Sequence, residues 1–97
     1  MLALVIESFL DDSPRLMAGL RQAVAQENGE AVYLAAHTLK SLGDNFGATI
    51  FAHLCRVIER SGQAGSLDGI AEQLRQLEHA YIQLKSALVS LQQEQMT

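Results

Sequence analysis

The sequence predicts an all-α fold: an antiparallel four-helix bundle with an extra or kinked N-terminal helical segment. Apolar residues recur at spacings of three and four along most of the chain, and no useful length alternates apolar and polar residues as a strand does. Glycines and the single proline separate the apolar stretches by short connections, which is typical of antiparallel bundles. A length of 97 residues suits one domain, which we expect to span residues 1–97.

Two helical segments are expected before the first long connection. Apolar residues lie at helical spacing from Leu2 to Leu10, and polar residues followed by Pro14 then interrupt them. Because serine is a favoured N-cap and proline is accepted at the first helical position, a second segment is expected to begin at Ser13. This segment is expected to end at Asn28–Gly29, a typical left-handed helix stop. The sequence leaves open whether the chain kinks or breaks near Ser13.

Two shorter helices are predicted in the middle of the chain. The first runs from about Glu30 to Leu42 and places an apolar stripe inward. A tight turn is expected at Gly43–Asn45, because glycine and asparagine tolerate positive φ. The second helix runs from about Phe46 to Ser61, ahead of a connection rich in glycine and serine. Its expected buried side chains are Phe46, Ile50, Phe51, Leu54, Val57 and Ile58.

The last predicted helix has the strongest periodicity in the chain. Its apolar positions alternate spacings of four and three, which indicates the seam of a helix packed in a bundle or a coiled coil. These positions are Ile70, Leu74, Leu77, Tyr81, Leu84, Leu88 and Leu91.

Composition excludes several classes of partner. The formal net charge is −4 and no run of lysine or arginine is present, which argues against nucleic-acid binding. No segment approaches the ~20 apolar residues of a membrane span, and the first residues do not resemble a signal peptide. The single cysteine, Cys55, fits a reducing compartment and is expected to be a small buried hydrophobe. We therefore expect a cytoplasmic chain without direct membrane contact, although it can still be a piece of a larger, even membrane-bound, protein.

Most sequence signatures of enzymes and metal sites are absent. The chain has no glycine-rich phosphate loop, no Gly-x-Ser-x-Gly elbow and no Cys-x-x-Cys pair. The histidines are too scattered for a His-x-x-x-His zinc helix, and no Glu-x-x-His pair provides di-iron ligands. We expect no metal or cofactor site in this chain.

The chemistry that remains lies on the helix predicted at residues 30–42. When its apolar stripe points inward, Tyr33, His37 and Lys40 form one exposed row at spacings of four and three. Histidine titrates near pH ~6.5, so a neutral, nucleophilic imidazole is well populated at neutral pH. Lys40 can stabilise the negative charge of a transferred phosphoryl group. By spacing alone, however, such a pair is most often solvated surface.

The surroundings of His37 suit the same chemistry. No acidic residue occurs between Ala31 and Gly43, although the protein is acidic, so we expect no carboxylate beside the imidazole to repel a phosphoryl group. Small residues let a partner protein approach closely, and apolar residues add contact area. The expected partner contacts of these two kinds are Ser41, Gly43, Gly47, Tyr33 and Leu34.

Residues 35–41 (Ala-Ala-His-Thr-Leu-Lys-Ser) and 45–48 (Asn-Phe-Gly-Ala) resemble the signature of the histidine-containing phosphotransfer (HPt) family. A His-x-x-Lys match alone is weak, but these residues match in register on the predicted helix, turn and helix. The resemblance extends to residues 9–14 and 54–59, so that it covers about Leu4 to Ser61. The final helix agrees with the family only in kind.

The resemblance implies an HPt-like domain of a multistep two-component phosphorelay in signal transduction. His37 then carries a phosphoryl group reversibly between receiver-domain aspartates, and Lys40 assists at that group. Ser41 takes the family's small-residue position, and Asn45 and Gly47 match its turn and close-packing positions. The implied partner is the receiver domain of a response regulator or hybrid sensor kinase, which supplies the aspartate, the magnesium ion and most catalytic groups. The chain itself is implied to be a phosphoryl carrier without a cofactor or autonomous catalytic activity.

The match departs from the family pattern just after Lys40. Leu42 and Gly43 stand where small polar residues are usual, and Asp44 replaces a common alanine. Leu42 either points inward or forms an apolar docking contact, and Asp44 adds a negative charge about two turns from His37. These departures bear on partner choice and on transfer rate.

Three alternative interpretations are left open. A helical docking module would bind a receiver or another regulatory protein without phosphorylation, although the retention of His37 and Lys40 argues against it. A homo-oligomeric coiled-coil element would explain the long final seam and predicts dimers. A metal-binding or oxidative bundle is disfavoured by the ligand spacing throughout.

Overall fold

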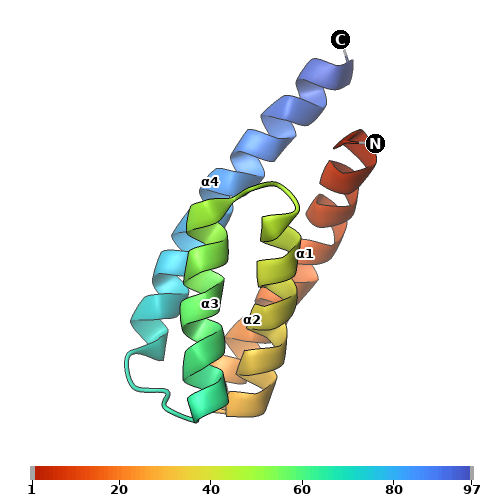
Figure 1. Ribbon diagram of the computed structural model, residues 1–97. Helices are drawn as coiled ribbons and strands as arrows, with labels where there is room; N and C mark the ends of the chain where they lie inside the picture. Colours follow the sequence, from red (N-terminus) through yellow and green to blue (C-terminus); the bar gives the residue numbers. More distant parts are fainter. Residues whose placement is uncertain (1, 97) are drawn as a thin grey trace.

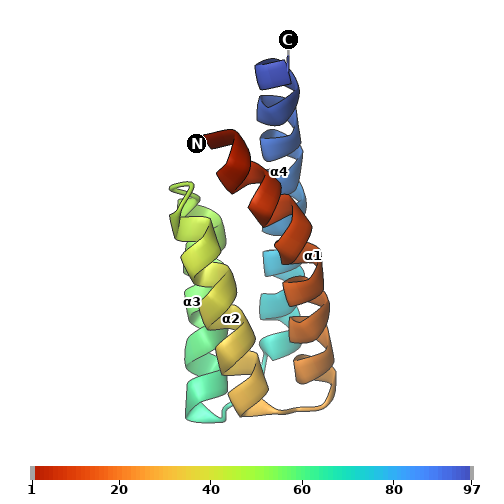
Figure 2. The same ribbon diagram turned by 90° about the vertical axis from the view of Figure 1, so that its right-hand side faces the viewer.

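The computed structural model describes the backbone of residues 2–96 and the side-chain burial of residues 4–94. Four helices follow one another, and no strand occurs within these residues: α1 (Leu2–Ala25), α2 (Gly29–Asp44), α3 (Thr49–Ala64) and α4 (Ile70–Met96). Both α1 and α3 pack against α2 and α4. Figure 2 shows the α2–α3 hairpin on one side of the molecule and α1 with α4 on the other. The predicted all-α bundle is confirmed.

The outer helices are longer than the hairpin that packs beside them. α1 and α4 contain 24 and 27 residues, whereas α2 and α3 contain 16 each. The N-terminal end of α1 and the C-terminal end of α4 therefore extend past the connection between α2 and α3 (Figure 1). None of the helices in the described residues is both long and apolar enough to cross a membrane.

A single helix, α1, contains both segments predicted at the N-terminus, with Pro14 inside it. Ser13 does not begin a new helix; it is buried, and its Oγ lies 2.9 Å from the hydroxyl oxygen of Tyr81 on α4. Because proline has no N–H, it removes one helical hydrogen bond and bends a helix that packing holds together. Figure 2 shows α1 changing direction along its length. The segment expected at Ser13 is thus the second half of one kinked helix.

The connection from α1 to α2 differs from the predicted stop at Asn28–Gly29. The positive φ angle, 55°, belongs to Glu27. Asn28 instead caps α2, because its Oδ1 accepts a hydrogen bond from the backbone N–H of Ala31 at 3.1 Å. Gly29 becomes the first residue of α2, which starts the helix that carries His37.

The turn between α2 and α3 lies later in the chain than predicted. Gly43 is buried inside α2, and Asn45 has ordinary right-handed helical angles. Gly47 has the positive φ angle, 63°, and α3 begins at Thr49 rather than at Phe46. The backbone N–H of Phe46 donates to the Gly43 carbonyl at 3.1 Å, which helps to close the turn.

The apolar core draws on all four helices. Its largest fully buried side chains include those of Phe9, Ile6, Met17, Leu20, Leu39, Ile58, Leu77 and Val32. The predicted seam of α4 is buried at Ile70, Leu77, Tyr81 and Leu88, whereas Leu91 near the protruding end is 41% exposed. The prediction that Ile50 is buried is wrong, since its side chain is 74% exposed. Because α3 begins at Thr49, the row of Phe51, Cys55 and Ile58 faces the core and Ile50 points outward.

Candidate functional site

The imidazole of His37 lies half-exposed on α2, and one of its two nitrogens is already held. Its side chain is 52% exposed, as predicted. The ring of Tyr33, one turn earlier, stacks on it with centroids 5.9 Å apart and planes inclined by 23°. Nδ1 lies 2.5 Å from Oε2 of Glu59 on α3. Nε2 forms no hydrogen bond with the described residues. That nitrogen is therefore available to a partner.

The ammonium group of Lys40 contacts the same carboxylate. Its Nζ donates to Oε1 of Glu59 at 3.0 Å and to Oε2 at 3.4 Å. The Lys40 side chain is only 20% exposed and that of Glu59 only 11% exposed. The prediction of one exposed row is therefore correct for His37 but wrong for Lys40, which leans towards α3 because Glu59 attracts it. We call the side chains of His37, Lys40 and Glu59 the charged triad.

The Glu59 carboxyl stays ionised at neutral pH. Burial acts to raise its pKa, but hydrogen bonds from Lys40 and His37 and their positive charges outweigh burial, so that the pKa lies below its usual value. A carboxylate with two donors is an acceptor only. Whenever the imidazole that faces this carboxylate is neutral, its proton lies on Nδ1 and its lone pair on Nε2.

The expectation that no carboxylate lies beside His37 is wrong. It considered only the neighbours of His37 along the chain, whereas Glu59 comes from α3, 22 residues later. A signal for Glu59 is present in the sequence: Ala52, Cys55, Glu59 and Gly62 follow one another at helical spacing, and all four are buried. A charged residue in an otherwise small and apolar row indicates a buried partner of opposite charge.

The predicted partner contacts fall into two groups. Leu34 and Ser41 are exposed on α2 near His37; the Leu34 side chain is 55% exposed, and Ser41 Oγ donates to the His37 carbonyl at 3.2 Å. Asn45 and Gly47 are exposed in and beside the turn.

Gly43 is not available to a partner, contrary to the prediction. It is buried in α2, and a Cβ at this position would lie 2.7 Å from Cδ2 of Phe51. The small residue is required by packing against α3. Gly47 has open space around it, so its backbone conformation rather than close packing requires glycine.

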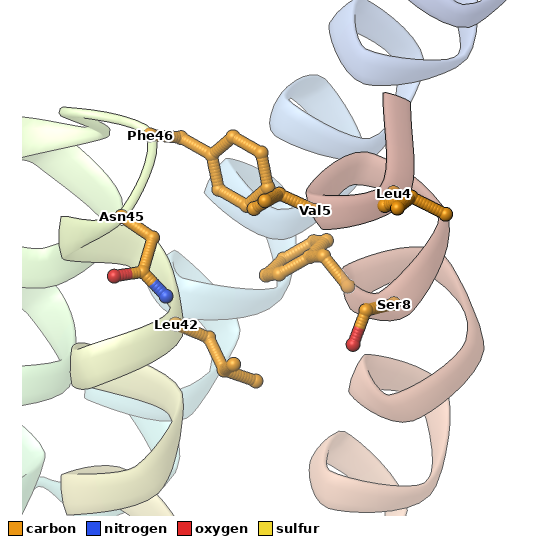
Figure 3. A pocket seen from close by; sticks show the side chains of 7 residues that line it. Leu4, Val5, Ser8, Leu42, Asn45 and Phe46 are labelled. Atoms are coloured by element: carbon orange, nitrogen blue, oxygen red, sulfur yellow. The ribbon is translucent and has the colours of Figure 1, made fainter. Parts of the chain in front are cut away.

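Leu42 lines an apolar groove between α1 and the end of α2. The groove has a volume of about 270 Å³ and is bordered by Leu4, Val5, Ser8, Phe9, Leu42, Asn45 and Phe46. Figure 3 shows Leu42 and Phe46 facing Val5 and Ser8 across it. Leu42 is half-buried and packs against the core, so the inward of its two predicted orientations is the observed one.

A reactive thiol and a metal site both find little support among the described residues. Burial raises the pKa of the Cys55 thiol to about 12, and the negative charges of Asp44 and Glu59 act in the same direction. The thiol is therefore an inert part of the core, as predicted. Within residues 2–96, no three His, Cys, Asp or Glu side chains form a group that could hold a metal ion.

The comparisons with known proteins agree with one another. A family model described as the Hpt domain matches residues 4–87. The fold is similar to a crystal structure of histidine-containing phosphotransfer protein B from Pseudomonas aeruginosa, with a TM-score of 0.90 and 23% sequence identity. That match covers 95% of this chain and 80% of the other. No curated protein sequence is significantly similar to the chain.

Proposed function

The chain belongs to the Hpt domain family, and we propose that His37 is the residue on which it carries the phosphoryl group. Its role is histidine phosphotransfer in a phosphorelay. The observation that supports His37 is its hydrogen bond to Glu59, which holds Nδ1 and leaves Nε2 without a hydrogen bond to the described residues, on a half-exposed ring. Within the described residues, neither His53 nor His79 forms an ion pair with a carboxylate.

The proposed step is an attack by Nε2 on the phosphorus of a receiver aspartyl phosphate. The Nε2 lone pair forms the N–P bond as the O–P bond breaks, and the aspartate leaves as a carboxylate with the electron pair. The ring then carries a positive charge. It keeps its proton on Nδ1 and donates a hydrogen bond from there to Glu59. The negative carboxylate stabilises this charged ring, as a buried aspartate does for the histidine of a catalytic triad. The reverse step passes the group to a second receiver.

Lys40 has a second part in this proposal. A carboxylate next to His37 would repel an incoming phosphoryl group, but Lys40 Nζ neutralises it at 3.0 Å. The ammonium also lies one helical turn from His37, where its positive charge favours the phosphorylated state. We therefore keep the prediction that Lys40 supports transfer and add that it does so partly by offsetting Glu59.

HPt domains interact with receiver domains in phosphorelays. We propose that a receiver of a response regulator or hybrid sensor kinase covers His37 and the exposed Leu34 and Ser41. The receiver would bring the aspartate and a magnesium ion, while this chain would act without a cofactor of its own. A cytoplasmic location is part of the same proposal, and a chain with one cysteine and no possible internal disulfide is consistent with it.

Phosphotransfer from radiolabelled, phosphorylated receiver domains tests the proposal directly. Label is expected on the wild-type chain, stable to alkali and labile to acid, and none on His37→Gln. The variant should melt within a few degrees of the wild type, because the replaced side chain is half-exposed. His53→Gln is the matched control, since it removes another exposed histidine and should keep full transfer. Label on His37→Gln, or loss of label in His53→Gln, would contradict the assignment. Receiver binding without transfer to the wild type would favour a docking module.

A further inference from the structure

The two helices that carry the charged triad cross at a pair of glycines. Gly62 lies in α3 and Gly29 begins α2, and the two residues are in backbone contact. A Cβ on Gly62 would lie 2.7 Å from the Gly29 carbonyl oxygen and 2.7 Å from the Tyr33 backbone nitrogen. Ordinary contacts of a Cβ begin at 3.4 Å. Because both obstacles are backbone atoms, no side-chain rotation relieves the clash, and a side chain on Gly62 must push the two helices apart.

The contact between Gly62 and the Tyr33 backbone lies one helical turn from the charged triad on both helices. Gly62 follows Glu59 by three residues on α3, and Tyr33 precedes His37 by four residues on α2. Both neighbours therefore lie on the same faces as the triad. A displacement of α3 from α2 at Gly62 is carried directly to the Glu59 carboxylate.

A second close contact lies on the far side of the triad. Gly43 of α2 meets the ring of Phe51 on α3, where an added Cβ would lie 2.7 Å from the ring. The triad thus lies between two points of close approach, and its long side chains span a gap that the glycines set. The ring at the Gly43 end can rotate, whereas the backbone atoms at the Gly62 end cannot. Gly62 therefore tolerates an added side chain less well than Gly43 does.

We infer that Gly62, together with Gly29, is a positioning residue that sets the separation of α2 and α3 and so holds Glu59 against Nδ1 of His37. The inference rests on the proposed role of His37 as the phosphoryl acceptor. Gly62 touches no reacting atom and acts through Glu59. Relief of the clash moves the added Cβ from 2.7 Å to an ordinary contact at 3.4 Å, a shift of about 0.7 Å, and the same shift would lengthen the 2.5 Å contact between Nδ1 and Oε2 to about 3.2 Å, the weak end of the usual hydrogen-bond range.

The test compares Gly62→Ala with Gly19→Ala in the complete chain. Gly19 is also helical, but an added Cβ there meets nothing within 4 Å, so this control should behave as the wild type. Nitrogen-15 NMR of the His37 ring reports which nitrogen carries the proton and whether the Nδ1 proton is protected. In Gly62→Ala we expect weaker protection of the Nδ1 proton and a larger share of the tautomer that carries its proton on Nε2. We expect phosphoryl transfer from a receiver to be about 10- to 100-fold slower, with receiver binding unchanged.

Two further variants test the inference independently of Gly62→Ala. Glu59→Asp shortens the carboxylate side chain without moving the helices, and should reproduce both the ring spectrum and the slow transfer. If Gly62→Ala does not fold, Gly29→Ala replaces it, because its added Cβ meets one carbonyl oxygen at 2.9 Å and the clash is milder. A folded glycine variant with the wild-type ring spectrum and transfer rate would overturn the inference. If the spectrum changes as expected but the wild type accepts no phosphoryl group, the positioning role stands and the proposed function fails.

Discussion

The α2–α3 hairpin and the α1–α4 pair are held together in different ways. Across the hairpin, glycines bring the backbones into contact and a charged triad fills the space between them. Across the pair of long helices, large apolar side chains such as Met17 and Leu77 are fully buried. Two polar contacts also join them within the described residues: a buried one between Ser13 and Tyr81, and a partly exposed ion pair between Arg21 and Glu78.

The apolar side chains and the charged triad therefore serve different ends: the first stabilise the fold, and the second positions His37 for chemistry. Burial of a large aliphatic side chain contributes ~1.5–3 kcal/mol, and the hairpin adds fully buried side chains such as Leu39 and Ile58 to those of the long helices. Buried charges contribute little net stability, because desolvation offsets their attraction. They do fix geometry, since both His37 and Lys40 must reach the same carboxylate at hydrogen-bond distance. The hairpin therefore combines its share of the apolar core with a charged triad that defines the orientation of His37.

The largest expected effect on stability comes from the apolar pair of helices. Leu77→Ala removes a side chain with no exposed surface and should lower the free energy of unfolding by about 2–5 kcal/mol. Urea denaturation followed by circular dichroism measures this loss. Under conditions where the variant remains folded, transfer to His37 should match the wild type. A large loss of transfer in the folded variant would show that the two regions are not separable.

Glu59→Gln tests the charged triad and should have a smaller effect on stability. We expect a loss of about 1–2 kcal/mol at pH 7, because Lys40 loses a charged acceptor while a similar shape remains. The pKa of Glu59 is lowered in the folded state, so its stabilising contribution is present above the usual value of 4.5 and is lost as the pH falls through the lowered pKa. The difference between wild type and variant should thus shrink below pH 4.5. Urea denaturation at several pH values measures it.

Glu72→Gln is the control for that titration. Hydrogen bonds from Arg75 lower the pKa of Glu72 as well, but this pair lies in open solvent. Water screens such a pair, so its removal should change the pH dependence of stability less than Glu59→Gln does. An equal change in both variants would argue against a special role for the buried carboxylate.

Tyr81→Phe removes a buried polar contact between α1 and α4. The Ser13 hydroxyl then lacks its partner at 2.9 Å, and we expect a loss of about 1 kcal/mol in the free energy of unfolding. Thermal melting and urea denaturation both measure it. Ser13→Ala combined with Tyr81→Phe should cost less than the two single changes added together. Strict additivity would mean that the two hydroxyls do not interact.

The smallest effect is expected at Ile50. Its side chain is 74% exposed, so Ile50→Thr should change the free energy of unfolding by no more than about 0.5 kcal/mol. Phe51→Ala, one residue later, removes a buried ring and is the contrasting control. A large loss in Ile50→Thr would mean that α3 is rotated relative to the structure described above.

Much of the fold follows from local patterns. The apolar spacing correctly predicts the helical bundle and most of the seam of α4, with Leu91 the exposed exception, because helical periodicity depends only on neighbours along the chain. The start and end of helices are less well predicted. Asn28 forms a cap where a stop is expected, and α2 extends over Gly43, since tertiary packing decides between local conformations of similar energy.

The sequence by itself determined the helical class of this protein, its apolar stripes and the histidine motif that marks its family. These are properties of residues three or four positions apart, and the helix places such residues together without help from the rest of the chain. Only the tertiary structure decided that Glu59 faces His37 and Lys40, that Ser13 bonds to Tyr81 and that Gly62 meets Gly29. Such contacts depend on the rotation and separation of whole helices, which the packing of all four sets at once.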